Sequence, residues 1–171
     1  MMVDTLTAAP ASIAPADIDR LRRELVTSRT YFARSSDQLT EEHSGFTPKE
    51  GTMTVAQQVA HVAHTLDWFR EGMTRPEGFD LNFEDALVAY AANTSLDEAR
   101  AWLDRSFDQV IRLFDEKPAE FWFEALPEGP VMGGQPRGTV VTAMVEHTAH
   151  HRGVLTVYAR LIGLQPTMPY S

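Results

Sequence analysis

The chain has 171 residues, a formal net charge of −9 and no cysteine. A chain of this length most simply forms one domain, which buries about 70% of the surface that its unfolded form exposes. The lack of cysteine excludes disulfides, thiolate metal ligands and a cysteine nucleophile, and the negative charge opposes non-specific binding to nucleic acid or to an anionic membrane.

Residues 1–15 are rich in alanine, proline, serine and threonine, which predicts a flexible leader ahead of a single domain at 16–171. The leader lacks the basic segment and the continuous apolar segment of a secretory signal. No later run approaches the roughly 18 apolar residues of a membrane-spanning helix. We therefore expect a cytoplasmic protein that binds neither membranes nor nucleic acid.

Two helices are predicted in the first half of the chain. Residues 17–42 carry a heptad-like apolar stripe with charged residues between its members, which predicts the first helix. Glycine and proline in 44–51 predict a connection. Thr52 or Thr54 can then cap a second helix that continues to about residue 73.

A third long helix follows a weaker segment. Residues 83–92 are compatible with a short helix. Ser95 and Glu98 then form the sequence pattern of a capping box, in which each side chain binds the backbone N–H of the other residue. Apolar residues at helical spacing continue this helix to about Lys117.

Proline and glycine fill residues 126–138, so this segment can be neither a helix nor a central strand. Because so long a loop leads directly into the next predicted helix, 139–162, it is a candidate lid or pocket wall. No segment is typical of a β-strand. Four amphipathic segments of about 20–25 residues predict an all-α fold, a four-helix bundle.

Five of the six histidines lie in two clusters on the second and fourth of these helices. The clusters are His61 with His64, and His147 with His150 and His151. Residues four apart on a helix lie on one face with Cβ atoms about 5–6 Å apart, so His147 and His151 can converge on one ion, which His150 cannot easily join. Burying an unpaired imidazole costs free energy, whereas a metal ion satisfies it.

The histidine clusters therefore predict a metal site built from His147, His151 and a third imidazole, His61 or His64. Three neutral nitrogens suit a divalent transition metal, with zinc or nickel preferred, better than magnesium or calcium. Three protein ligands leave a fourth position for water or substrate. Thr148 stands where the H-E-x-x-H motif has its general base, which argues against a metalloprotease.

Two segments resemble the DinB/YfiT-like family of metalloenzymes: residues 54–61, and residues 147–153 with the ending 158–163. The resemblance implies a four-helix bundle with up-down-down-up topology, often as a homodimer. It also implies a divalent metal held by three histidines.

Carried over by motif position, the three implied ligands are His61, His147 and His151, and His150 matches a position that usually lies outside the coordination sphere. The residue after the first histidine of the last helix is often glutamate in relatives. Thr148 replaces it here, so an acid–base role at that position is not expected.

The resemblance implies a small-molecule enzyme that depends on its metal, because relatives include thiol-dependent S-transferases and a mycothiol-dependent maleylpyruvate isomerase. We expect an S-transferase that uses a low-molecular-weight thiol as co-substrate, or a related metal-dependent hydrolase. One alternative is a non-catalytic stress-related or ligand-binding bundle in which the metal is structural. Another is a helical interaction module whose histidines are merely packed.

Five further residues carry expectations. Arg137 and Arg152, with loop 126–138, are candidates to contact an anionic substrate. Trp68 is a candidate for the pocket wall and His43 is expected to be exposed. Gly153, in the interior of the last helix, costs about 1 kcal/mol relative to alanine, and a close approach between helices is its simplest explanation.

Overall fold

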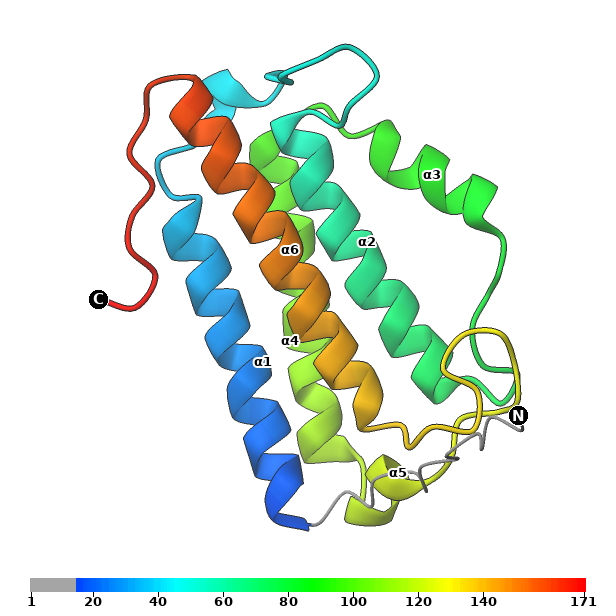
Figure 1. Cartoon of the computed structure of the whole chain (residues 1–171). Helices are drawn as coiled ribbons and strands as arrows, with labels where there is room; N and C mark the ends of the chain where they lie inside the picture. Colours follow the sequence, from blue (N-terminus) through cyan, green and yellow to red (C-terminus); the bar gives the residue numbers. More distant parts are fainter. Residues whose placement is uncertain (1–14) are drawn as a thin grey trace, which may run out of the picture.

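The computed structural model describes residues 15–171, and the elements that it contains are all helices, as predicted (Figure 1). The four long helices are α1 (Pro15–Ser35), α2 (Val55–Thr74), α4 (Leu96–Glu116) and α6 (Thr139–Leu161). The short ones are η1 (Glu41–His43), α3 (Phe83–Ala91) and α5 (Ala119–Phe123). The predicted leader lies outside the described residues, except for Pro15, which begins α1.

The four long helices form a bundle with up-down-down-up topology, which confirms the expected fold. In Figure 1, α1 and α6 run upward, whereas α2 and α4 run downward. Because α2 and α4 are parallel neighbours, the chain between them must return along the whole length of the bundle. This connection, residues 75–95, contains α3 and lies on the outer side of α2 (Figure 1).

Helix α2 is the most enclosed of the long helices. It packs against α4, α6 and α3, and more than half of its residues are buried. Thr54 caps it: the Thr54 hydroxyl accepts from the Gln57 N–H, and the Gln57 side chain accepts from the Thr54 N–H. Each such cap stabilises a helix by about 1 kcal/mol. Because neighbouring helices enclose α2, a polar side chain that it buries needs a hydrogen-bond partner on one of them.

Helix α1 ends at Ser35, earlier than the apolar stripe predicts. The Ser36 hydroxyl donates to the carbonyl of Phe32, a local bond that competes with helix continuation. Arg100 of α4 then donates to the carbonyls of Ser36 and Leu39. Leu39 is nevertheless fully buried, so the stripe correctly identified a core residue that lies in a turn.

The capping box predicted at the start of α4 is only half present. The Ser95 hydroxyl accepts from the Glu98 N–H at 3.2 Å, but among the bonds of the described residues the Glu98 side chain makes no return bond. The Asp97 N–H instead donates to Glu41 at 2.8 Å, which lowers the pKa of the Glu41 carboxyl. A carboxylate from η1 thus occupies the helix N-terminus, where negative charge is favoured.

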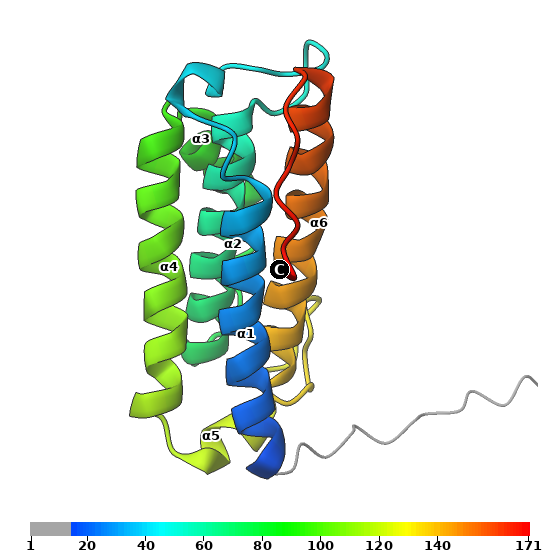
Figure 2. The same cartoon turned by 90° about the vertical axis from the view of Figure 1, so that its left-hand side faces the viewer.

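The C-terminal segment runs back beside α1 and α6 (Figure 2). The ring of Tyr170 packs edge-on against Tyr31, with centroids 5.0 Å apart. The Thr167 hydroxyl donates to Asp37 at 2.8 Å. These contacts hold the chain end against α1, on the side of the bundle away from α3.

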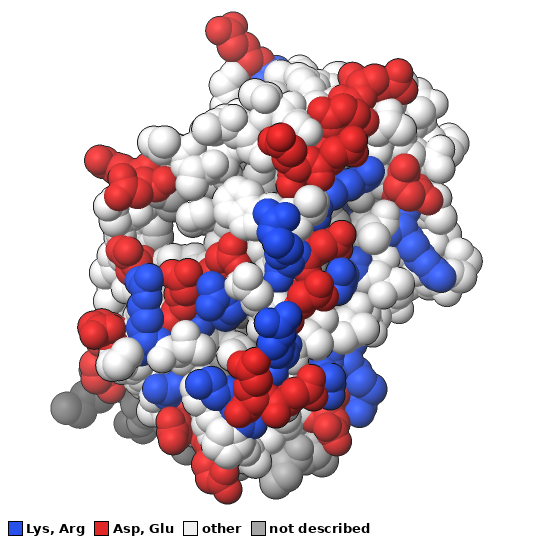
Figure 3. All heavy atoms as spheres, turned by 180° about the vertical axis from the view of Figure 1, so that it is seen from behind, with Lys and Arg blue, Asp and Glu red and all other residues white. Residues whose placement is uncertain are grey.

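Acidic and basic side chains are interspersed on the face shown in Figure 3. On α1 and α4, Arg29 contacts Asp104 at 2.9 Å and Asp108 at 2.7 Å. Exposed pairs of this kind stabilise a fold by only about 0–1 kcal/mol each, so they align helices more than they hold the bundle together. None of the described helices combines the length and apolar character that crossing a membrane requires.

Candidate metal centre

Three of the predicted histidines come together between α2 and α6. His61, His147 and His151 each offer a ligand nitrogen, and these nitrogens all lie within 4.8 Å of one another. The ring centroids of His61 lie 5.0 Å from His147 and 4.8 Å from His151. Zinc–nitrogen bonds of about 2.0–2.1 Å would draw the three rings slightly closer. The arrangement can therefore hold one ion.

Helix α6 aims its two histidines inward because they share its apolar face. Met144 and Leu155, at helical spacing from the pair, are fully buried. His151 is buried, whereas His147 and the facing His61 of α2 are half-buried. The face that builds the bundle core thus also builds the cluster.

Burial keeps all three imidazoles neutral near pH 7. It lowers the pKa of His61 and of His147 to about 4, and that of His151 to about 3. The neighbouring imidazoles contribute to these lowered pKa values after burial, because each disfavours a second positive charge. Neutral imidazole is the form that binds a metal.

Two nitrogens of the cluster also lack a protein partner. Nδ1 of His61 and Nε2 of His147 are buried and make no hydrogen bond to any described residue. An unpaired polar atom in a protein interior costs about 1–3 kcal/mol, so such atoms call for an explanation. A bound transition metal fits this donor set and would remove the cost.

Gln58 orients the third imidazole. Its Oε1 lies 2.6 Å from Nδ1 of His151. Because an amide oxygen only accepts hydrogen bonds, Nδ1 of His151 carries the proton and Nε2 keeps its lone pair. The Gln58 amide donates to the Tyr158 hydroxyl at 3.4 Å, and that hydroxyl donates to the carbonyl of Met53 at 3.1 Å. Partners of this kind fix the orientation of metal-binding histidines.

The other two clustered histidines, His64 and His150, are not part of the group of three whose nitrogens lie close together. His64 lies beside Tyr90 and Trp102, with ring centroids 6.1 Å from each. His150 is exposed, although its ring lies 4.9 Å from that of His151. Of the two candidates for the third imidazole, the group of described residues whose ligand atoms lie close together contains His61 and not His64.

A pocket of about 680 Å³ opens beside the cluster, and His61 and His147 form part of its wall. The opposite wall is the connection 80–90 with α3. The Tyr90 ring packs on His61 at 4.6 Å between centroids. Trp68 lines the pocket, as predicted, and its indole N–H donates to the carbonyl of Asp80 at 2.6 Å. The connection 80–90 is thereby tied to α2.

Comparison with known proteins identifies the family. Residues 24–155 match the DinB superfamily. The chain belongs to the DinB superfamily. Its fold is similar to that of YfiT from Bacillus subtilis, described as a probable metal-dependent hydrolase with an unusual four-helix bundle topology. The two share 16% identity and a TM-score of 0.67, over 92% of this chain and 94% of YfiT. None of the curated proteins compared matches this chain.

The loop predicted as a lid or pocket wall in this DinB-superfamily protein lies elsewhere. None of the described residues that line the pocket comes from 126–138. Arg137 donates to the carbonyls of Met73 and Ala125, and its guanidinium lies over the ring of Phe121. It therefore satisfies a carbonyl in the last turn of α2 and links that turn to α5. Arg152 lies over the ring of Tyr31. Neither arginine is among the described residues that line the pocket, so a role in contacting an anionic substrate gains no support from it.

The structure also places His43, Gly153 and Thr148. His43 is only partly exposed, because its Nδ1 accepts from the Thr40 N–H at 3.0 Å. Gly153 is exposed and a Cβ there would meet nothing within 4 Å, so it marks no close helix approach. Thr148 is fully buried and is not a pocket residue. It therefore supplies no acid–base group to the pocket.

Proposed function

We propose that this protein is a metal-dependent enzyme in which His61, His147 and His151 hold one divalent transition metal, preferably zinc or nickel. The observation that carries the proposal is the convergence of three neutral imidazoles, two with unpaired buried nitrogens, at the wall of a pocket. When bound, the ion would supply Lewis-acid chemistry, lowering the pKa of a water or thiol that it binds.

The protein's own residues prepare the site for this chemistry. Gln58 holds His151 with Nε2 available. Trp68 of α2 and Tyr90 of α3 line the pocket with aromatic surface, and the Tyr90 ring packs on His61. A volume of about 680 Å³ is in the range of small-molecule sites, so the substrate we propose is a small molecule.

For the reaction we propose transfer to or from a low-molecular-weight thiol, or a related hydrolysis. The description of YfiT as a probable metal-dependent hydrolase supports the hydrolytic form. Family resemblance supports the transferase form. Because the chain has no cysteine, the thiol would have to be a co-substrate.

The first test is elemental analysis of untagged protein purified without added metal. We expect near one equivalent of a transition metal in the wild type and little in His147→Ala or His151→Ala. His150→Ala is the matched control, since His150 neighbours the cluster on the same helix but is exposed, and it should keep its metal. Full metal retention in both ligand variants would contradict the site.

The second test separates catalysis from a structural metal, the alternative function. Access supports catalysis, because two of the three histidines line the pocket. Metal-loaded protein should bind low-molecular-weight thiols, or turn over thiol and electrophile pairs or hydrolysable esters. A large drop in melting temperature on chelation without any thiol binding or turnover would favour a bracing role for the metal.

A further inference from the structure

The pocket beside the three histidines has an unbalanced charge. Its lining includes the carboxylates of Asp67, Glu71, Asp80 and Asp85, and among the described residues that line it none is a lysine or an arginine. We propose that this pocket selects substrates that carry a cationic group, such as a protonated amine. The inference rests on the proposed function, since it names the substrate class of the same site.

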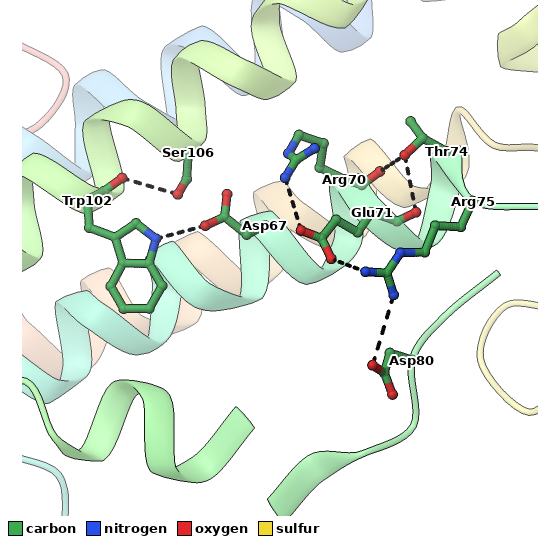
Figure 4. Close-up of polar contacts among 8 residues, drawn as sticks. All are labelled: Asp67, Arg70, Glu71, Thr74, Arg75, Asp80, Trp102 and Ser106. Atoms are coloured by element: carbon green, nitrogen blue, oxygen red, sulfur yellow. Dashed lines mark hydrogen bonds and ion pairs between the residues drawn. The ribbon is translucent and has the colours of Figure 1, made fainter. Parts of the chain in front are cut away.

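Two of these carboxylates are already neutralised. Figure 4 shows Glu71 between Arg70 and Arg75, at 3.2 Å and 2.8 Å. Arg75 also approaches Asp80 at 3.9 Å. Two arginines thus balance two carboxylates, and the remaining two have no cationic partner among the described ion pairs.

Asp67 is the carboxylate best placed to bind a ligand. It is half-buried, and its Oδ2 accepts from the indole N–H of Trp102 at 2.7 Å (Figure 4). Its Oδ1 is buried and makes no hydrogen bond to any described residue. A charged oxygen left unpaired away from water is costly, and a ligand N–H⁺ would remove that cost. Burial also lowers the pKa of the nearby His64, so a neutral imidazole leaves the charge of Asp67 in place.

The aromatic wall of the pocket suits the same class of ligand. Trp68, Phe83 and Tyr90 line it, and aromatic faces attract cations in addition to packing against apolar groups. Asp67 follows His61 by six residues, which corresponds to about 9 Å along the axis of α2. A substrate that reacts beside His61 while its cation meets Asp67 therefore has several atoms between the two groups.

The experiment uses full-length, metal-loaded protein and two probes of similar shape, phenethylammonium and 2-phenylethanol. Their dissociation constants are measured by calorimetry at pH 7.5. We expect the cation to bind at least about tenfold more tightly than the neutral alcohol, which corresponds to about 1.4 kcal/mol. Equal affinities, or no measurable binding of the cation up to millimolar concentration, would overturn the proposal.

Variants assign the effect to this carboxylate. Asp67→Asn keeps an acceptor for Trp102 and should bring the two affinities to within about twofold of each other. Asp19→Asn removes one charge at an exposed position of α1 and should change neither. If Asp67→Asn does not fold, Asp85→Asn, exposed on α3, should weaken cation binding about two- to threefold. Unchanged preference for the cation in the pocket variants would contradict the assignment.

The metal content of each sample separates this inference from the proposed function. Metal-loaded protein that does not distinguish the probes would refute cation selection alone. Protein without affinity for metal that still prefers the cation would refute the metal-dependent function alone.

Discussion

Gln58 decides which nitrogen of His151 faces the other two imidazoles, because its side-chain oxygen binds Nδ1. Removing such a partner typically lowers metal affinity about 10- to 100-fold. We expect Gln58→Ala to do so, as measured by competition with a chromophoric chelator. Gln58→Glu keeps an acceptor and should stay closer to wild type. Wild-type affinity in Gln58→Ala would show that packing alone orients His151.

Two glycines inside helices differ in what an added methyl group would contact. Replacing each by alanine should therefore change the free energy of unfolding in opposite directions. At Gly153 the space is open, so Gly153→Ala should raise the free energy of unfolding by about 0.5–1 kcal/mol. At Gly72 a Cβ would collide with the ring of Phe79, so Gly72→Ala should lower it by about 1–3 kcal/mol. Urea denaturation measures both, and the same sign for the two would contradict this account.

At the residue scale, sequence spacing predicted two of the clustered imidazoles, and the family resemblance chose the third. Gln58 was missed as their orienting partner, although it lies three residues before His61 on the same helix. The decisive bond joins side chains 93 positions apart, and spacing within one helix carries no information on such a pair. Asp67 was missed because a charged residue on an amphipathic helix is usually solvated.

At the element scale, the connection 75–95 forms the pocket wall through a small number of contacts. Apolar residues of α3 remain exposed, among them Phe83 at 59% and Val88 at 68%. The Trp68 indole bond to Asp80 and the Gln57 amide bond to the carbonyl of Ala91 attach the two ends of this wall to α2. An element with so few buried contacts opens locally at low free-energy cost.

We therefore expect Trp68→Phe, which removes the indole donor, to loosen this wall without unfolding the bundle. Hydrogen exchange followed by mass spectrometry should show amides of residues 80–91 exchanging about tenfold faster, with α4 unchanged. Trp102→Phe is the control, because its indole donates to Asp67 rather than to the connection. Equal acceleration in every helix would indicate global destabilisation instead.

The sequence predicted a long loop at 126–138 and only a weaker segment before the third long helix, and it did not show which of the two faces the site. Residues 126–138 have the proline- and glycine-rich composition of a long loop, which suggested a lid or pocket wall. They instead join α5 to the start of α6 at one end of the bundle (Figure 1). The connection 75–95 joins parallel helices and must pass along the side of α2 that carries His61. Topology thus selects the wall, and the apolar pattern of a single element does not reveal topology.

At the scale of the whole molecule, the buried histidines couple acid stability to the metal site. In the unfolded chain imidazoles titrate near pH 6.5, whereas folding lowers the pKa of the three clustered histidines to about 4, 4 and 3. Between these pH limits the unfolded state binds more protons than the folded state. The contribution of the three histidines to stability is therefore complete above about pH 6.5 and is lost as the pH falls toward 4.

We expect the metal-free protein to lose about 2–4 kcal/mol of unfolding free energy between pH 7 and pH 4 from these groups. This figure is reduced because two of the three rings are partly exposed to solvent. Urea denaturation across this range measures it. His151→Leu removes the most strongly shifted group and should lose less stability on acidification. The same acid dependence in His151→Leu and wild type would mean that other groups control it.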